Sequence, residues 1–253
     1  MSLPTSPAPI AILSALAEEQ KGLLDALSDR QEVVQGGRSY WCGLLYGRPV
    51  VLALSRIGKV AAATTATALI SHFGVRSMLF TGVAGGLAQG VRVGDLVVAD
   101  GLLQHDMDAS PLFARYEVPL LGRAVFPTDV ALRLPLQHAC ALALDSLALP
   151  PGPTPSVHTG LVVSGDRFVS GTAEASILRN DLQRAGHQPL AVEMEGAAVA
   201  QVCADYGVPL ALVRTISDRA DDDAHHDFSV FVEEVASVYA RAIVRYWLEL
   251  LSK

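Results

Sequence analysis

The sequence lacks any cluster of basic residues and any long apolar run. Its 253 residues include 19 Lys and Arg against 26 Asp and Glu, which gives a formal net charge of −7. Proteins that bind nucleic acid or an anionic membrane surface usually gather basic residues on one face, so the sequence argues against both partners. No apolar stretch reaches the length of about 20 residues that a membrane-spanning helix needs.

Cysteines are few and unsuited to a disulfide framework. Cys42, Cys140 and Cys203 are scattered, odd in number and set among apolar residues. We therefore expect three free, buried thiols and a cytoplasmic protein. The start of the sequence, MSLPTSPAP, has neither the basic beginning nor the apolar core of a signal peptide. Its Pro/Ser content predicts a disordered tail over 1–9, followed by one domain over 10–253.

Hydrophobic residues, in contrast, are abundant at 51% of the chain, which is enough for a large core. Short β-branched runs alternate with segments of helical spacing. This alternation predicts an α/β fold: a single-domain three-layer sandwich with a mixed central β-sheet flanked by helices. The expected strands are 10–15, the two arms of a hairpin over 37–55, 77–81 running into a Gly-rich turn, 94–106, 157–165, 189–195 and 208–217. The expected helices are 16–27, 58–74, 126–147, 172–186, 196–207 and the segment from 228 onward.

Acidic and glycine-rich stretches follow several of these strands. In open α/β sheets ligands bind where the strands end. The stretches there are Glu18-Glu19, TGVAGG (81–86), SGDRF (164–168), EME (193–195) and SDRAD (217–221). A buried carboxylate costs several kcal/mol unless it is paired or neutralised, so carboxylates at the ends of buried strands call for a function.

Each stretch alone has an ordinary structural explanation. TGVAGG has neither the dinucleotide-binding spacing nor the lysine of a P-loop, and a tight turn explains it as well as a binding loop. Acidic residues in a first helical turn are favoured by the helix dipole. The stretches 221–227 (DDDAHHD) and 105–108 (HDMD) contain metal-binding residue types, but a polar loop and a hydrogen-bonded turn are favoured. Ser164 and Ser170 lack the G-x-S-x-G setting of a hydrolase triad.

Taken together, the motifs are specific. In order they are IAILSALAEEQ, SRIGKVAAA, TGVAGGL with VGDLVVAD, HDMDASPLF, VVSGDRFVSG, AVEMEGAAVAQVC and VRTISDRAD. This series resembles the 5′-methylthioadenosine/S-adenosylhomocysteine nucleosidases of the nucleoside phosphorylase superfamily, over about residues 10–250. The resemblance implies a nucleoside phosphorylase-like fold. It also implies hydrolysis of the N-glycosidic bond that releases adenine in methionine salvage and the activated-methyl cycle, with no metal and no organic cofactor.

The resemblance also assigns roles to individual residues. Asp218 would be the general acid at adenine N7, and Glu19 would deprotonate the attacking water. Glu195 would bind the ribose hydroxyls, with Met194 packed beside the sugar. Further substrate contacts would come from Phe168 stacking on adenine, the Val169 backbone at the purine edge, Phe228 over the sugar and 5′-thio side, and Ser217, Val83 and Ile57.

Some positions depart from the family pattern or receive no role. Val83 stands where the family commonly has Ser, and no Arg lies beside it, which favours water over phosphate as the nucleophile. We expect Glu193 to be satisfied by nearby backbone and Arg214 to pair with one of the carboxylates. Arg56 is expected at the surface, although it could approach a phosphate or the carboxylate of a longer substrate.

Three alternatives to hydrolysis of these two thionucleosides stay open. They are phosphorolytic cleavage of purine nucleosides on the same fold, hydrolysis of 6-amino-6-deoxyfutalosine, and nucleoside binding without turnover. The resemblance also implies a homodimer. Within it, residues 105–119 (HDMDASPLFARYEVP) are our candidate for the segment that closes the partner's pocket.

Overall fold

The computed structural model describes residues 8–147, 154–221, 231 and 235–251. Four predictions fall partly or wholly outside these residues: most of the tail 1–9, nearly all of the acidic and His-containing stretch 221–227, Phe228, and much of the first part of the helix expected from 228 onward. The rest of the chain can be compared with its predicted elements.

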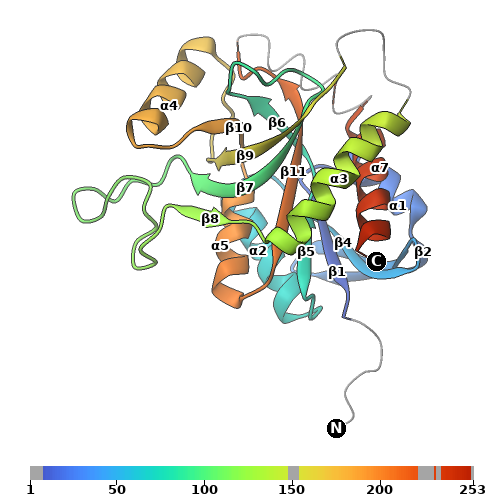
Figure 1. The fold of residues 1–253 in the computed structure, drawn as a ribbon. Helices are drawn as coiled ribbons and strands as arrows, with labels where there is room; N and C mark the ends of the chain where they lie inside the picture. Colours follow the sequence, from blue (N-terminus) through green and yellow to red (C-terminus); the bar gives the residue numbers. More distant parts are fainter. Residues whose placement is uncertain (1–7, 148–153, 222–230, 232–234, 252–253) are drawn as a thin grey trace.

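In the described part of the chain, a mixed sheet of eleven strands forms the centre of the molecule (Figure 1). The strand order is β2-β3-β4-β1-β5-β11-β6-β10-β9-β7-β8, and β11 also pairs with β7. The strands are β1 (Ile10–Ser14), β2 (Ser28–Gln35), β3 (Arg38–Leu45), β4 (Arg48–Leu54), β5 (Ser77–Phe80), β6 (Val83–Gly86), β7 (Leu96–Gln104), β8 (Val125–Pro127), β9 (Val157–Ser164), β10 (Pro189–Glu193) and β11 (Leu210–Asp218).

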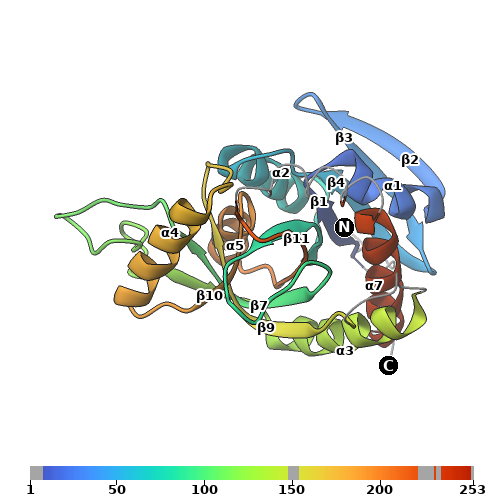
Figure 2. The same cartoon turned by 90° about the horizontal axis from the view of Figure 1, so that it is seen from above.

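Helices cover both faces of the sheet, which confirms the predicted three-layer α/β sandwich (Figure 2). The helices are α1 (Ala17–Ala26), α2 (Lys59–Ser71), α3 (Val130–Ser146), α4 (Thr172–Arg184), α5 (Gly196–Tyr206) and α7 (Ser237–Leu250). Helices α2 and α5 pack together on one face, while α1, α3 and α7 pack together on the other.

The alternation of side chains along β1 shows how the two cores form. Ala11 and Leu13 point into the core under α2 and α5. Ile12, between them, points into the core under α1, α3 and α7. Successive side chains of a strand face opposite sides of the sheet, and here both sides are buried, so the run is apolar throughout. This is why its strand character was evident from the sequence.

Three segments differ from their predicted structure. Strand β2 was not predicted, because as an edge strand it is exposed on nearly its whole length and carries no apolar alternation. The predicted Gly-rich turn is strand β6, paired with β10 and β11. The predicted helix 126–147 begins only at Val130, where the Asp129 side chain accepts from Leu132 N, and β8 precedes it.

In the described part of the chain, no helix combines the length and the apolar character needed to cross a membrane. Cys42, Cys140 and Cys203 are free thiols, as expected. Cys140 and Cys203 are buried, but Cys42, on β3 near the edge of the sheet, is only partly buried, which differs from the prediction.

Candidate active site

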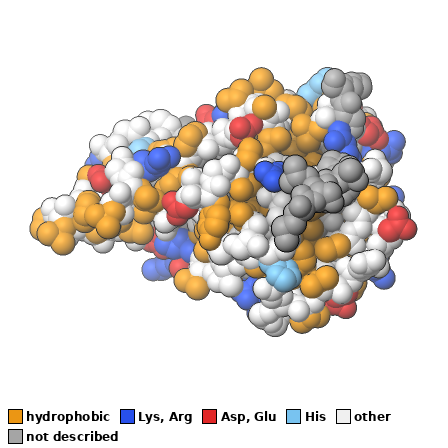
Figure 3. All heavy atoms as spheres, turned by 90° about the horizontal axis from the view of Figure 1, so that it is seen from below, with side chains coloured by type: hydrophobic (Ala, Val, Ile, Leu, Met, Phe, Trp, Pro, Cys, Tyr) orange, Lys and Arg blue, Asp and Glu red, His pale blue; other side chains and the backbone are white. Residues whose placement is uncertain are grey.

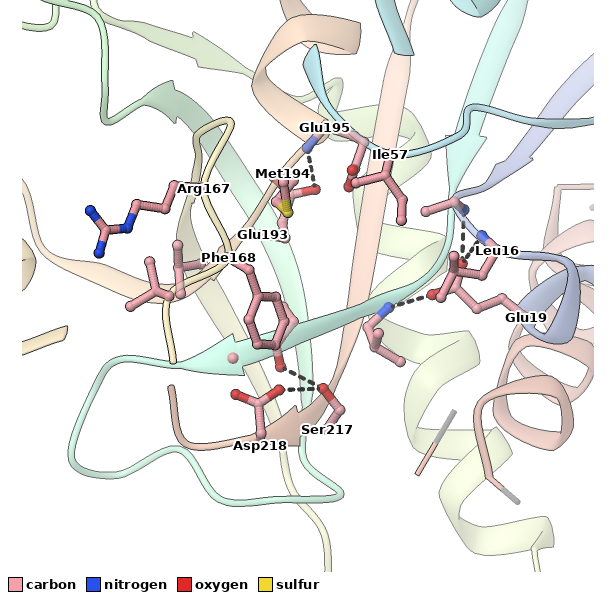
Figure 4. A pocket seen from close by; sticks show the side chains of 16 residues that line it. Leu16, Glu19, Ile57, Arg167, Phe168, Glu193, Met194, Glu195, Ser217 and Asp218 are labelled. Atoms are coloured by element: carbon pink, nitrogen blue, oxygen red, sulfur yellow. Dashed lines mark hydrogen bonds between the residues drawn. The ribbon is translucent and has the colours of Figure 1, made fainter. Parts of the chain in front are cut away.

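A cavity of about 440 Å³ opens at the carboxyl ends of β1, β10 and β11. It lies within the usual size range of small-ligand sites. The structure brings together, at this one cavity, nine of the ten residues selected from the sequence: Glu19, Ile57, Val83, Phe168, Val169, Met194, Glu195, Ser217 and Asp218. Phe228 lies outside the described residues. Figure 4 shows Glu19, Glu195 and Asp218 bordering the cavity from three different sides.

Glu19 lies in the first turn of α1 and is 1% exposed. Its Oε2 accepts hydrogen bonds from Ala15 N at 2.8 Å and Leu16 N at 3.0 Å, and its Oε1 accepts from Val83 N at 3.1 Å. Burial raises the pKa of Glu19, against the opposing effects of these three N–H groups and of Arg214. The carboxylate therefore caps the helix and also faces the cavity.

Glu193 is a structural carboxylate. Its Oε2 lies 2.6 Å from Arg214 Nη2, and both side chains are almost fully buried. Glu193 also accepts from Gly196 N and from the Ser164 hydroxyl, while the Arg214 guanidinium stacks over the Phe80 ring at 4.1 Å. The predictions that Glu193 is satisfied by nearby backbone and that Arg214 pairs with a carboxylate are both confirmed.

Glu195 occupies the position before the first residue of α5. Its Oε1 accepts from Gly58 N at 2.8 Å, and the residue is 5% exposed. Burial, and next the negative charge of Glu193, raise the pKa of Glu195 to about 8, although Gly58 N–H and Arg214 act in the opposite direction. Glu195 therefore keeps its proton well into the neutral pH range.

This raised pKa predicts a pH dependence of stability. Because the native state binds the Glu195 proton more tightly than the unfolded chain does, the free energy of unfolding should fall as pH rises between about 5 and 8, by at most about 1.4 kcal/mol per pH unit from this group. Urea unfolding of Glu195→Gln should show a shallower decline than wild type. The exposed Glu18→Gln is the matched control. An unchanged slope in Glu195→Gln would contradict the assignment.

Asp218 ends β11 and is 2% exposed. Its Oδ2 accepts from the Ser217 hydroxyl at 2.7 Å, and its Oδ1 accepts from Ala220 N at 2.8 Å. A Cβ at Gly85 of β6 would lie 2.8 Å from Asp218 Oδ1. The glycine of the TGVAGG stretch is therefore required for close approach to this carboxylate, and not for a turn.

One wall of the cavity comes from the loop after β9. Phe168 is 38% exposed and Val169 is buried, and Figure 4 shows the Phe168 ring beside Ser217 and Asp218. Arg167 also lines the cavity and forms an ion pair with Glu174 at 2.7 Å. Arg167 was not selected from the sequence, although its position in the SGDRF stretch, directly after a predicted strand, indicated that it could line the site.

The other polar candidates lie away from these contacts. Asp106 of the HDMD stretch accepts from Lys59 and from Asp166 N, which makes the stretch a hydrogen-bonded turn as expected. Among the residues that the structure describes, no group of three or more His, Cys, Asp or Glu side chains is arranged to hold a metal ion. Arg56 is exposed and donates to the Gly37 carbonyl, in agreement with its predicted surface position.

Comparison with known proteins agrees with this geometry. Residues 9–251 match the model of the phosphorylase superfamily. A 5′-methylthioadenosine/S-adenosylhomocysteine nucleosidase from Neisseria meningitidis, solved with methylthio-immucillin-A, is 33% identical, with 96% of this chain and 100% of that chain covered and a TM-score of 0.86. An aspartate-to-asparagine mutant of the Helicobacter pylori nucleosidase, with 5′-methylthioadenosine in its active site, is 32% identical (96% and 99% covered, TM-score 0.84).

A second type of enzyme is equally similar. The futalosine hydrolase of Helicobacter pylori strain 26695 is 32% identical, with 96% of this chain and 97% of that chain covered and a TM-score of 0.83. The family match, over residues 9–251, includes every residue that lines the cavity. The chain belongs to the phosphorylase superfamily and, within it, to the family of the 5′-methylthioadenosine/S-adenosylhomocysteine nucleosidases.

Proposed function

We propose that this protein hydrolyses the N-glycosidic bond of 5′-methylthioadenosine and S-adenosylhomocysteine, releasing adenine and the 5-thioribose product. The observation that carries the proposal is the convergence of three buried carboxylates, Glu19, Glu195 and Asp218, on one cavity. Support also comes from the similar nucleosidases, one solved with 5′-methylthioadenosine and one with methylthio-immucillin-A.

Cleavage of this bond develops negative charge on the leaving base and an oxocarbenium cation on the ribose. In the proposal, Asp218 donates a proton to adenine N7 as the bond breaks. The Ser217 hydroxyl, 2.7 Å from Asp218 Oδ2, orients the carboxyl group. Phe168 stacks on the base and the Val169 backbone bonds its edge, which holds N7 beside the acid.

The sugar side needs a base for water and acceptors for the hydroxyl groups. Glu19 has a raised pKa, which makes it a stronger base than an exposed glutamate at neutral pH. Glu195 accepts from the ribose hydroxyls, and Met194 packs beside the ring. Ile57 and Val83 supply apolar walls, so Val83 offers no hydroxyl to either the ribose or the water.

Charge at the cavity favours water over phosphate as the nucleophile. Of the described residues that line the cavity, Arg167 is the one cation, and it pairs with Glu174. Arg214, beneath the cavity, is engaged by Glu193. A phosphate anion at the sugar would lose its hydration and find no free cation among the described residues that line the cavity, which would cost free energy in a buried site.

A second candidate substrate is 6-amino-6-deoxyfutalosine, which the similarity to a futalosine hydrolase supports. The proposal is tested by following adenine release from 5′-methylthioadenosine, S-adenosylhomocysteine and 6-amino-6-deoxyfutalosine by chromatography. Preferred release from the two thionucleosides supports the main proposal. A kcat/KM that is tenfold or more higher for the futalosine would replace it with the second candidate, and absence of adenine from all three would contradict both.

We further propose that the protein acts as a homodimer. Residues 105–124, between β7 and β8, project from the body of the molecule (Figures 1 and 2). Leu112 and Leu120 there are 84% and 90% exposed, and hydrophobic side chains gather at the projecting end (Figure 3). Apolar groups so exposed are typical of an interface, and 105–119 is our candidate for closing the partner's pocket. Light scattering should show a dimer, and a fully active monomer would contradict the proposal.

Free thiols support the proposed cytoplasmic location, because none of the three cysteines is in a disulfide. Fractionation of the producing cell with an antibody to the protein would test this location.

A further inference from the structure

Lys59, the first residue of α2, links three segments around the cavity. Its backbone N–H donates to Asp166 Oδ1 at 2.7 Å. Its Nζ donates to Asp106 Oδ1 at 2.6 Å and to Gln104 Oε1 at 3.1 Å. The Lys59 side chain is only 16% exposed. The start of α2, the end of β7 and the loop after β9 are therefore joined at this one residue.

On the sugar side, the residues just before Lys59 form part of the cavity. Ile57 lines it, and Gly58 N donates to Glu195 Oε1 at 2.8 Å. Gly58 has φ +94°, which places it in the backbone region that favours glycine. Two successive backbone N–H groups thus reach opposite walls of the cavity. Gly58 N–H donates to Glu195 on the sugar side, and Lys59 N–H donates to Asp166 on the side of the base.

On the base side, Asp166 connects directly to the wall for the purine. Its own N–H donates to Asp106 Oδ2 at 2.9 Å, and Arg167, Phe168 and Val169 follow it along the cavity. Asp106 therefore accepts from Lys59 with one oxygen and from the base-side loop with the other.

The Lys59–Asp106 contact is more than an exposed ion pair. Although burial alone would raise the pKa of Asp106, hydrogen bonds from the Lys59 ammonium and from Asp166 N–H keep that pKa below its usual range. The carboxylate is thus ionised and its hydrogen bonds are charge-assisted, which makes them stronger than neutral ones. Gln104, the second acceptor of Lys59, is held in turn by its bond to Gln201 of α5.

We propose that Lys59 is a positioning residue that sets the separation between Glu195 and the base-side loop. When this separation is fixed before binding, the base and the ribose of one nucleoside contact both walls at once. The two walls then lose little conformational entropy on binding, because they are already held in place. The inference rests on the proposed function, because it takes the ligand to be a nucleoside that spans both walls.

The test compares a ligand that needs one wall with a ligand that needs both. In Lys59→Met the affinity for adenine alone should stay within about twofold of wild type, because Asp106 and Asp166 still bond each other. Affinity for methylthio-immucillin-A, and kcat/KM for 5′-methylthioadenosine, should each fall about tenfold. Calorimetry and initial-rate assays give these values.

Two further variants and a control make the result decisive. Asp106→Asn weakens the same contact from its other side and should give the same selective loss. The double variant should lose little more than either single one, because the two residues act as a unit. Lys21→Met, at an exposed residue of α1, is the control and should match wild type.

The inference is overturned if Lys59→Met and Asp106→Asn, both folded by circular dichroism, bind methylthio-immucillin-A within twofold of wild type. Equal losses for adenine and for the nucleoside analogue would also overturn it, because they would indicate general damage to the site. If the wild-type protein releases no adenine, the proposed function fails instead. The affinities for adenine and for methylthio-immucillin-A can be measured without turnover, so their ratio still tests the role of Lys59.

Discussion

Replacing Asp218 by Asn is expected to lower kcat for 5′-methylthioadenosine by about 10²–10⁴-fold, while substrate affinity changes only a few-fold. An amide has the same shape but cannot deliver a proton to the leaving base. It can keep both observed contacts, since its oxygen can accept from Ala220 N and its NH₂ can donate to the Ser217 oxygen. The melting temperature should therefore stay close to that of wild type.

Single-turnover assays with adenine detection measure this effect, with equilibrium binding measured on the same samples. Asp205→Asn, at an exposed position in α5, is the matched control and should retain full activity. If Asp218→Asn kept a kcat within tenfold of wild type, Asp218 would not be the general acid, and protonation of the base would have to come from another group.

Glu19→Gln should lower kcat by a similar factor, about 10²–10⁴-fold. Its affinity for methylthio-immucillin-A should stay within a few-fold of that of wild type. The amide cannot take a proton from water. It would also place an NH₂ group against Val83 N, where the carboxylate now accepts a hydrogen bond at 3.1 Å. Loss of that bond in a buried site should lower the free energy of unfolding by about 1–3 kcal/mol.

The neighbouring Glu18→Gln is the control, because Glu18 is exposed while Glu19 is buried in the same helical turn. The comparison also separates an enzyme from a nucleoside-binding protein. A binding protein would have no wild-type turnover for Glu19→Gln to remove. Equal turnover in Glu19→Gln and wild type would show that another group activates the water.

Much of the fold could be predicted because the buried strands carry their own pattern. Strand β1 is apolar on both faces and lies between two helical layers, so its sequence shows both its conformation and its burial. Strand β2 shows the opposite case. It is stabilised by antiparallel pairing with β3 and not by side-chain burial, and pairing with a distant residue leaves no local signal.

The strand ends directed attention to the stretches that contain Glu19, Glu195 and Asp218, and the resemblance to the nucleosidases then selected these residues and their roles. Contacts across the fold were harder to predict. Lys59 and Asp106 are 47 positions apart, and nothing near either residue indicates the other. For the glycines of TGVAGG, a tight turn and a binding loop were equally good interpretations. Their actual constraint, at Gly85, comes from the Asp218 carboxylate of another strand.

The most direct test of the account is to identify the sugar product of 5′-methylthioadenosine cleavage in the presence of excess inorganic phosphate. The account predicts free 5-methylthioribose in equal amount to adenine, with a rate that phosphate does not change, because the described residues of the cavity walls offer no free cation to bind that anion. A sugar 1-phosphate detected by phosphorus NMR, with a rate that rises with phosphate, would contradict water as the nucleophile and Glu19 as its base.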